Sequence, residues 1–187
     1  MARRKEATSE RIVDAAVAVF SKISYGTASV EDIARDAGVT KVTVYQHYKS
    51  KEELFVACLQ RRLERREAVL DEFIHNLAPD VDPLLAVFDW LEDWLDPGKF
   101  SGCAFAKAAN ELGSSMPIVR VIAAVAKMKI TQRFAELAEK SGRQHPIQLG
   151  QELALIFEGA QSLAFIEESA RPAQLARKIA SALVKHD

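Results

Sequence analysis

The stretch SVEDIARDAGVTKVTVYQHYKSKEELF, residues 29–55, decides the fold of this chain. Ser29 stands three residues before Asp32, and a serine at that spacing caps a helix start by accepting a hydrogen bond from an unpaired backbone N–H. Gly38 then supplies a left-handed residue that ends the helix without a Cβ clash. The pattern predicts a short helix that begins after Ser29 and ends before a tight turn.

Two further caps follow the turn. Thr40 can cap a second short helix, and Ser50 with Glu53 forms a capping box for a third. A helix, a tight turn and a second helix in so few residues are typical of a helix-turn-helix, which places its second helix in the DNA major groove.

The second helix has one face for packing and one for contact. At about 100° per residue, Val44 points opposite to Val42 and Gln46. We expect Val44 and Tyr48 to pack into the core, whereas Val42 and Gln46 face solvent or DNA. A glutamine pairs with an adenine edge, and a valine rests on a thymine methyl group.

Polar and aromatic side chains flank this outer face. Lys41 can reach a guanine edge or a phosphate, and Tyr45 and His47 suit phosphate or base-edge contacts. Lys49 and Lys51 stand where the DNA backbone would pass, next to a helix start that adds partial positive charge. Each also has an ordinary interpretation, as a capper of a small core for the tyrosine or as a solvated surface group for the others.

The stretch resembles the DNA-binding domain of the TetR-type (tetracycline-repressor-like) transcriptional regulators, over about residues 8–59. The family pattern I-A-x-x-A-G-V, a threonine before an aliphatic-tyrosine pair, and K-x-K-x-x-L are matched by residues 33–39, 43–45 and 49–54. The chain departs from the family at Ser24, where glycine is frequent, and at Ala28, where threonine is frequent. The resemblance implies DNA contacts by Ser29, Lys41, Val42, Thr43, Tyr45, Gln46, His47 and Lys51.

A supporting helix is expected before this stretch. Thr8 or Ser9 can cap it, and Ile12, Ala16 and Phe20 recur at helical spacing. Three basic residues at positions 3–5 precede it and suit a minor groove or phosphates, or else a solvated terminus.

Charge separates the two ends of the chain. The whole chain has a net charge of −1, but residues 1–62 carry eleven lysines and arginines against eight acidic residues. A basic head on an acidic body is typical of DNA binding by one end only. With no leader, no membrane span and only two cysteines, we expect a cytoplasmic protein in contact with no membrane. We expect nothing basic to adjoin Cys103 and lower its pKa, so a redox role is not expected.

The remaining sequence is helical and has no strand-like alternation, which predicts an all-α protein of about nine helices. Breaks at prolines and glycines separate predicted helices over about residues 50–76, 84–96, 103–113, 117–140, 147–169 and 173–185. We expect an N-terminal helix-turn-helix domain at residues 1–49 and a helical ligand-binding and dimerisation domain at residues 50–187. The segment that begins Phe100-Ser-Gly-Cys103 resembles the C-terminal domain of one TetR subgroup.

Aromatic and apolar residues in the second domain predict a small-molecule site. The helix at 84–96 is apolar on more than one face, as expected of a helix that lines a cavity or is buried on both sides. The alternative is that these side chains are ordinary core. The candidate ligand-binding residues are Trp90, Trp94, Phe105, Met128, Phe157 and Gln161.

The last two helices predict a homodimer. Leu149, Leu153, Phe157 and Ala160 form one stripe, and Gly159, Ala160 and Ala164 permit close approach of another helix. In the final helix the stripe consists of Leu175, Ile179, Ala182 and Leu183. Two such helices from each subunit form a four-helix interface, and the resemblance implies the same dimer. Packing within one subunit is the alternative.

No enzyme, cofactor or metal site is predicted. The four histidines are scattered, and adjacent carboxylates on a helix diverge. We therefore expect a ligand-responsive DNA-binding regulator, most simply a repressor, that binds a near-palindromic operator as a homodimer and is released by a small-molecule effector. The rival is a helical ligand- or protein-binding module whose DNA head has low specificity.

Overall fold

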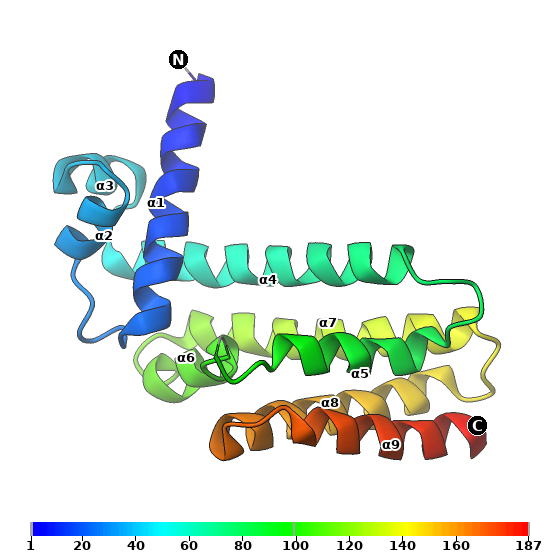
Figure 1. Ribbon diagram of the computed structural model, residues 1–187. Helices are drawn as coiled ribbons and strands as arrows, with labels where there is room; N and C mark the ends of the chain where they lie inside the picture. The colour runs from blue at the N-terminus through cyan, green and yellow to red at the C-terminus, as the bar shows by residue number, and fades with distance from the viewer. Residues whose placement is uncertain (1, 99, 187) are drawn as a thin grey trace. The chain divides into compact units, whose positions relative to one another are not determined.

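The structure is a computed structural model that describes residues 2–98 and 100–186, and it is all-helical over those residues. The predicted fold class and the predicted number of helices are confirmed there (Figure 1). The helices are α1 (Ala2–Lys22), α2 (Val30–Asp36), α3 (Lys41–His47), α4 (Lys51–His75), α5 (Pro83–Trp94), α6 (Ala104–Leu112), α7 (Pro117–Lys140), α8 (Pro146–Glu167) and α9 (Arg171–His186).

The chain divides into two compact units, Met1–Arg66 and Glu67–Asp187. The division falls inside α4 and not at residue 49, because the first turns of α4 belong to the N-terminal core. Leu54 and Cys58 pack there with Ile12, Ile33 and Val44.

The N-terminal unit is built from α1, α2, α3 and the start of α4. The apolar face of α1 is buried at Ile12 and Ala16, as its spacing predicts. The predicted start of α1 at Thr8 or Ser9 was wrong. The helix runs from Ala2, because residues 2–7 are good helix formers with no glycine or proline to stop it. The Ser9 hydroxyl instead lies 2.7 Å from the Tyr48 hydroxyl, and Tyr48 packs against the core as predicted.

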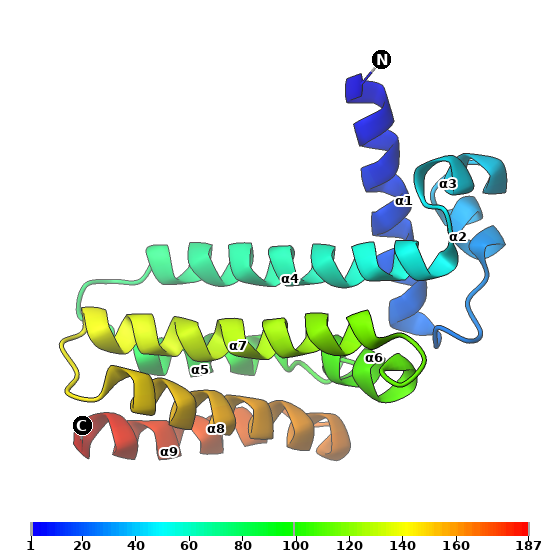
Figure 2. The ribbon, with the colours of Figure 1, turned by 180° about the vertical axis from the view of Figure 1, so that it is seen from behind.

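The C-terminal unit contains the end of α4 and α5–α9. Its centre is a triangle of fully buried rings: Phe88 and Phe134 have centroids 5.5 Å apart, and Phe157 lies 6.3 and 6.0 Å from them. Figures 1 and 2 show α7, α8 and α9 running side by side in this unit. At the α7–α8 contact the backbones approach closely, since a Cβ added to Gly150 would lie 2.7 Å from the backbone nitrogen of Ala135.

The helix starts of this unit follow from proline and side-chain caps. Pro83, Pro117 and Pro146 each occupy the first turn of a helix, where the missing N–H costs nothing. Asp82 caps α5 by accepting from the Leu84 N–H at 2.9 Å, and its other oxygen accepts from Arg143 at 2.8 Å. The predicted helix boundaries therefore agree with the observed ones to within about two residues.

Candidate functional site

Helix α3 is anchored by one side chain and exposes the opposite face. Val44 is 1% exposed, whereas Val42 is 66% and Tyr45 43% exposed. Gln46 is exposed as well, and Thr43 and His47 are half-buried. The predicted orientation of α3 is confirmed, and its outer face consists of side chains that the unit does not need for packing.

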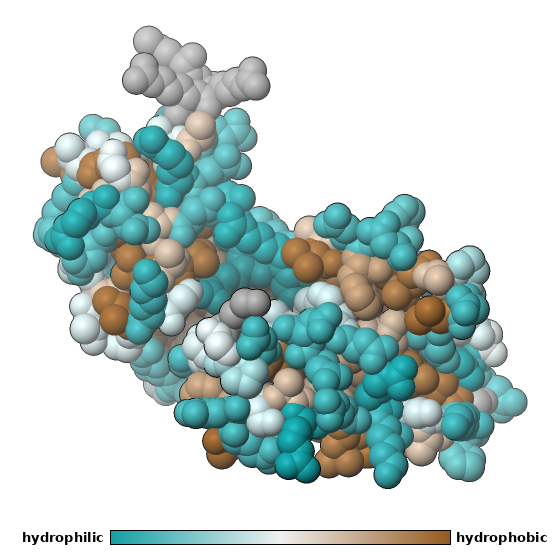
Figure 3. Space-filling view, viewed as in Figure 1, coloured by the Kyte–Doolittle hydropathy of each residue, from teal (hydrophilic) through white to brown (hydrophobic). Residues whose placement is uncertain are grey.

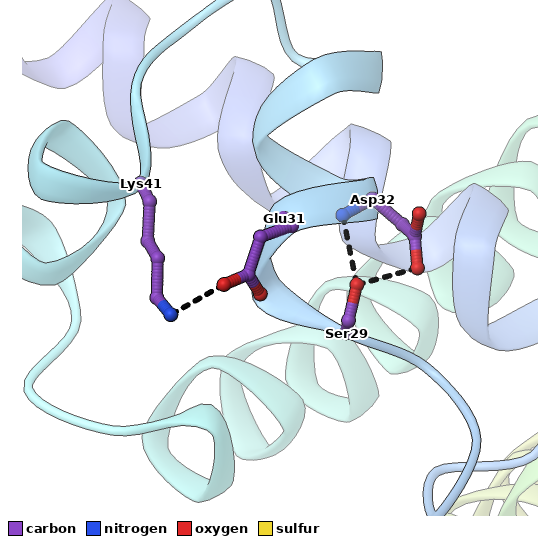
Figure 4. Close-up of polar contacts among 4 residues, drawn as sticks. All are labelled: Ser29, Glu31, Asp32 and Lys41. Carbon is purple, nitrogen blue, oxygen red and sulfur yellow. Dashed lines mark hydrogen bonds and ion pairs between the residues drawn. The ribbon is translucent and has the colours of Figure 1, made fainter.

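The start of α2 is fixed by Ser29 (Figure 4). The Ser29 hydroxyl accepts from the Asp32 backbone N–H at 3.1 Å and donates to the Asp32 carboxylate at 2.5 Å. This hydrogen bond from Ser29 holds the pKa of Asp32 below its ordinary value. The predicted cap is confirmed, and any contact with a phosphate requires the hydroxyl hydrogen of Ser29 to leave Asp32.

The turn into α3 is fixed in the same way. Gly38 has φ +63°, in the left-handed region, and Thr40 accepts from the Thr43 N–H at 3.1 Å. The hydroxyls of Thr40 and Thr43 are 2.9 Å apart. At the start of α4, Ser50 accepts from the Glu53 N–H at 3.1 Å, while the Glu53 carboxylate accepts from the N–H of Lys49 at 2.7 Å. These caps give α3 a defined direction.

Lys41 forms an ion pair with Glu31 (Figure 4). The hydrogen bond between them raises the pKa of Lys41 and lowers that of Glu31, and both side chains are about half exposed. The Lys41 ammonium also lies 5.9 Å from the centroid of the Tyr45 ring. A carboxylate therefore stands beside the first residue of α3, where it would repel DNA phosphates and compete with them for Lys41.

Replacement of Glu31 by glutamine is expected to strengthen binding to duplexes of any sequence. One exposed repulsion is removed and one lysine is released, so the gain is about a few-fold, because solvent screens exposed charges strongly. Fluorescence anisotropy with random duplexes at two salt concentrations measures it. Glu64→Gln on α4 makes the same charge change at another exposed site of the unit. An equal gain in both variants would show an effect of net charge alone.

Lys51 has a second role that the sequence did not indicate. Its ammonium donates to the backbone carbonyl of Tyr25 and lies 4.1 Å from the centroid of the Tyr25 ring. The Tyr25 hydroxyl donates to Glu52 at 2.9 Å, and burial, with this carboxylate second, raises the pKa of Tyr25. Lys51 thus holds the segment between α1 and α2, and its remaining N–H groups are available to a phosphate.

The basic residues at the N-terminus were a further candidate contact. Lys5 is exposed on α1. The side chains of Arg3 and Arg4 lie outside the part of the chain that the structure describes.

The C-terminal unit brings together three of the six predicted ligand residues, Trp90, Trp94 and Phe157. The rings of Trp90 and Trp94 stack with centroids 5.5 Å apart, and Trp90 also stacks on Phe157 at 6.4 Å. Phe100, which the sequence did not single out as a ligand residue, lies 5.4 Å from Trp94. Gln161 is 3% exposed on α8.

Of the other two predicted ligand residues, one is exposed and one is buried. Met128 is 60% exposed on α7, so the expectation that it faces the interior was wrong. The neighbouring Ala126 and Ile130 take the buried positions of that helix. Phe105 is buried on α6.

A polar cluster in this unit was missed. The Lys127 ammonium lies 3.1 Å from the Cys103 sulfur and forms an ion pair with Glu158. The expectation that nothing basic adjoins Cys103 was therefore wrong, because α7 supplies the lysine from 24 residues away. No spacing in the sequence could indicate this contact between Lys127 and Cys103.

Within residues 2–98 and 100–186, no helix is long and apolar enough to span a membrane. The same residues contain no group of three or more acidic, histidine or cysteine side chains arranged to hold a metal ion.

Comparison with known proteins agrees with the geometry of the N-terminal unit. Residues 12–58 match the model of the family described as bacterial regulatory proteins, tetR family. The helix-turn-helix transcriptional repressor SCO4008 of Streptomyces coelicolor is 36% identical over 95 residues, which are 51% of this chain and 42% of that protein. The transcriptional activator FasR of Mycolicibacterium smegmatis is 30% identical over 86 residues, 46% of this chain and 39% of that protein. The chain thus matches less than half the length of either relative.

A solved structure extends the likeness to the whole fold. A TetR transcriptional regulator from Chloroflexus aurantiacus is similar with a TM-score of 0.79 and 24% identity, covering 98% of this chain and 96% of that one. At this identity the likeness shows the fold alone.

Proposed function

We propose that this chain, which belongs to the tetR family of bacterial regulatory proteins, represses transcription by binding a near-palindromic operator as a homodimer. It is a transcriptional regulator with a helix-turn-helix. The observation that carries the proposal is the outer face of α3, where Val42, Tyr45 and Gln46 are exposed while Val44 holds the helix in the core. These side chains match the chemistry of base edges in a major groove.

We assign the dimer contact to α8 and α9, on the face that the unit leaves uncovered. On α8, Leu155 is 76% and Ile166 73% exposed, and on α9 Leu175 and Ile179 are 57% and 44% exposed. Apolar patches appear along the lower edge of Figure 3, where Figure 1 draws these helices. Large exposed apolar side chains in a row favour a protein partner, and a second copy of this surface gives a two-fold contact.

The stripe predicted on α8 points into the unit and not outward, so its predicted orientation was wrong. Leu149, Leu153, Phe157, Ala160 and Ala164 are buried inside the unit, which leaves Leu155, Gly159 and Ile166 on the outer face. On α9, Leu175 and Ile179 are exposed as the prediction requires, and Leu183 packs against the core.

We place the effector site at the aromatic set, which consists of Trp90 and Trp94 on α5 and Phe157 on α8. The stacked rings provide an apolar wall, and the buried Gln161, one helical turn from Phe157, provides one polar anchor, as small-molecule sites commonly do. A ligand releases the operator only to the extent that it binds more tightly to the conformation that does not bind DNA than to the conformation that does.

Replacement of Gln46 by alanine tests the reading role. We expect the variant to lose preference at one base pair of each half-site, by roughly 1–3 kcal/mol, while it keeps its affinity for the other positions. Lys51→Ala is expected to weaken all sequences alike and to reduce the salt slope, with an added loss of stability from the released Tyr25 segment. Binding to single-base operator variants measures both. An equal loss on every sequence for Gln46→Ala would contradict the reading role.

A further inference from the structure

Two polar atoms on α8 are buried without a hydrogen-bond partner among the described residues. They are Oε1 of Glu158 and Nε2 of Gln161. Gln161 is 3% exposed, so its amide is almost entirely removed from solvent. An unpaired buried donor or acceptor is costly, and each one in a folded protein calls for an explanation.

Helix geometry places Gln161 between aromatic neighbours on one side and polar neighbours on the other. Its neighbours on the helix surface are Phe157, Glu158 and Phe165, at i−4, i−3 and i+4. Phe157 stacks on Trp90, and Glu158 pairs with Lys127. The Phe165 ring lies against Gly102, since a Cβ there would be 3.1 Å from it. The Gln161 amide therefore lies between the aromatic set and the segment that holds Cys103.

On the aromatic side, the Trp94 ring reaches solvent. Trp94 stacks on the buried Trp90 and meets Phe100 edge-on, yet it remains 36% exposed. A planar molecule that entered beside Trp94 would cover this ring and gain apolar burial and stacking.

The polar side is neutral as a whole. The Lys127 ammonium is shared between Oε2 of Glu158 and the Cys103 sulfur, so the carboxylate charge is already balanced. Oε1 of Glu158 can still accept a hydrogen bond, and Nε2 of Gln161 can still donate one. A ligand that satisfies both atoms needs an acceptor for Gln161 and a donor for Glu158 within one small polar group, since the two side chains are one helical turn apart.

We propose that this site binds a neutral, planar aromatic molecule whose polar group carries a carbonyl-type acceptor next to an N–H or O–H donor. The proposal rests on the proposed function, in which the C-terminal unit receives an effector, and it names the chemical class of that effector.

Three small probes of similar size separate the contributions. Toluene offers only the ring, benzoate adds acceptors and a charge, and benzamide adds an acceptor and a donor. Binding is measured on the full chain without DNA, from the rate at which iodoacetamide alkylates Cys103, followed by intact mass. Cys103 is half-buried, whereas Cys58 is 2% exposed and burial raises its pKa to about 12, so Cys103 is the thiol that reacts in the folded protein.

We expect benzamide to slow alkylation of Cys103 at least fivefold at saturation and to bind about tenfold more tightly than toluene or benzoate. In Gln161→Leu, benzamide should lose about tenfold in affinity while toluene keeps its own, because the amide is replaced by an apolar group of similar volume. Glu158→Gln keeps the shape of the side chain but replaces a carboxylate, which only accepts hydrogen bonds, by an amide, which accepts and donates. It should therefore also weaken the binding of benzamide. Thermal melting of each variant confirms that it is folded.

Equal binding of the three probes, or benzamide binding unchanged in both variants, would overturn the proposal. A separate measurement of operator binding with saturating benzamide distinguishes it from the proposed function. If benzamide binds as expected and the operator is not released, the proposed binding site is supported and the control of DNA binding by a ligand at this site is contradicted. If the operator is released with Cys103 still freely alkylated, this site is not where the ligand acts.

Discussion

A chain with Leu155→Glu and Ile166→Glu is expected to be monomeric and to lose operator affinity by at least about a hundredfold. Both side chains are largely exposed on one face of α8, so charges placed there do not disturb the unit's own core. They would be buried and unpaired in the dimer, which makes association unfavourable. Loss of the partner removes the second half-site contact, and with it the gain from linking two binding events.

Sedimentation velocity gives the oligomeric state, and anisotropy with the operator gives the affinity. Val121→Glu is the matched control, because Val121 is 55% exposed on α7 and lies outside α8 and α9. A double variant that stays dimeric, or a control that dissociates equally, would place the contact elsewhere.

Phe134→Ala is expected to destabilise the C-terminal unit by about 3–5 kcal/mol. Phe134 is fully buried between Phe88 and Phe157, and the space that it leaves cannot be filled by the other two rings without losing their contacts. Urea unfolding followed by circular dichroism measures the free energy of unfolding. Met128→Ala, on the same helix at a 60% exposed position, should change it by about 0.5 kcal/mol or less. Similar losses in the two variants would mean that the rings do not form the core.

The helix-turn-helix was predictable because its signals are local. A cap, a left-handed glycine and a buried valine each lie within a few residues of the structure that they specify, and Ser29, Gly38 and Val44 were all placed correctly. The ends of α4–α9 were predictable for the same reason, since prolines and glycines mark them. The start of α1 was missed because a possible cap does not stop a helix that favourable residues continue.

The facing of α8 and the polar contacts could not be predicted. A helix that is apolar on both sides gives no period that separates inside from outside, so the stripe through Phe157 could not be told from the one through Leu155. The Lys41–Glu31 pair joins two helices, and the Lys127–Cys103 contact joins α7 to the residue that precedes α6, at separations that only the packed structure sets. These contacts change what is expected of Lys41 and Cys103 more than the arrangement of the helices does.

We expect two copies of α3 to bind one operator as a pair. Selection of the full chain against random duplexes at physiological salt, with sequencing of the bound fraction, tests it directly. The expected result is an inverted repeat whose half-sites lie about 10–10.5 base pairs apart, centre to centre, or a multiple of that spacing. Enrichment of a single half-site, or of no sequence at all, would contradict it and favour a helical binding module without specific DNA recognition.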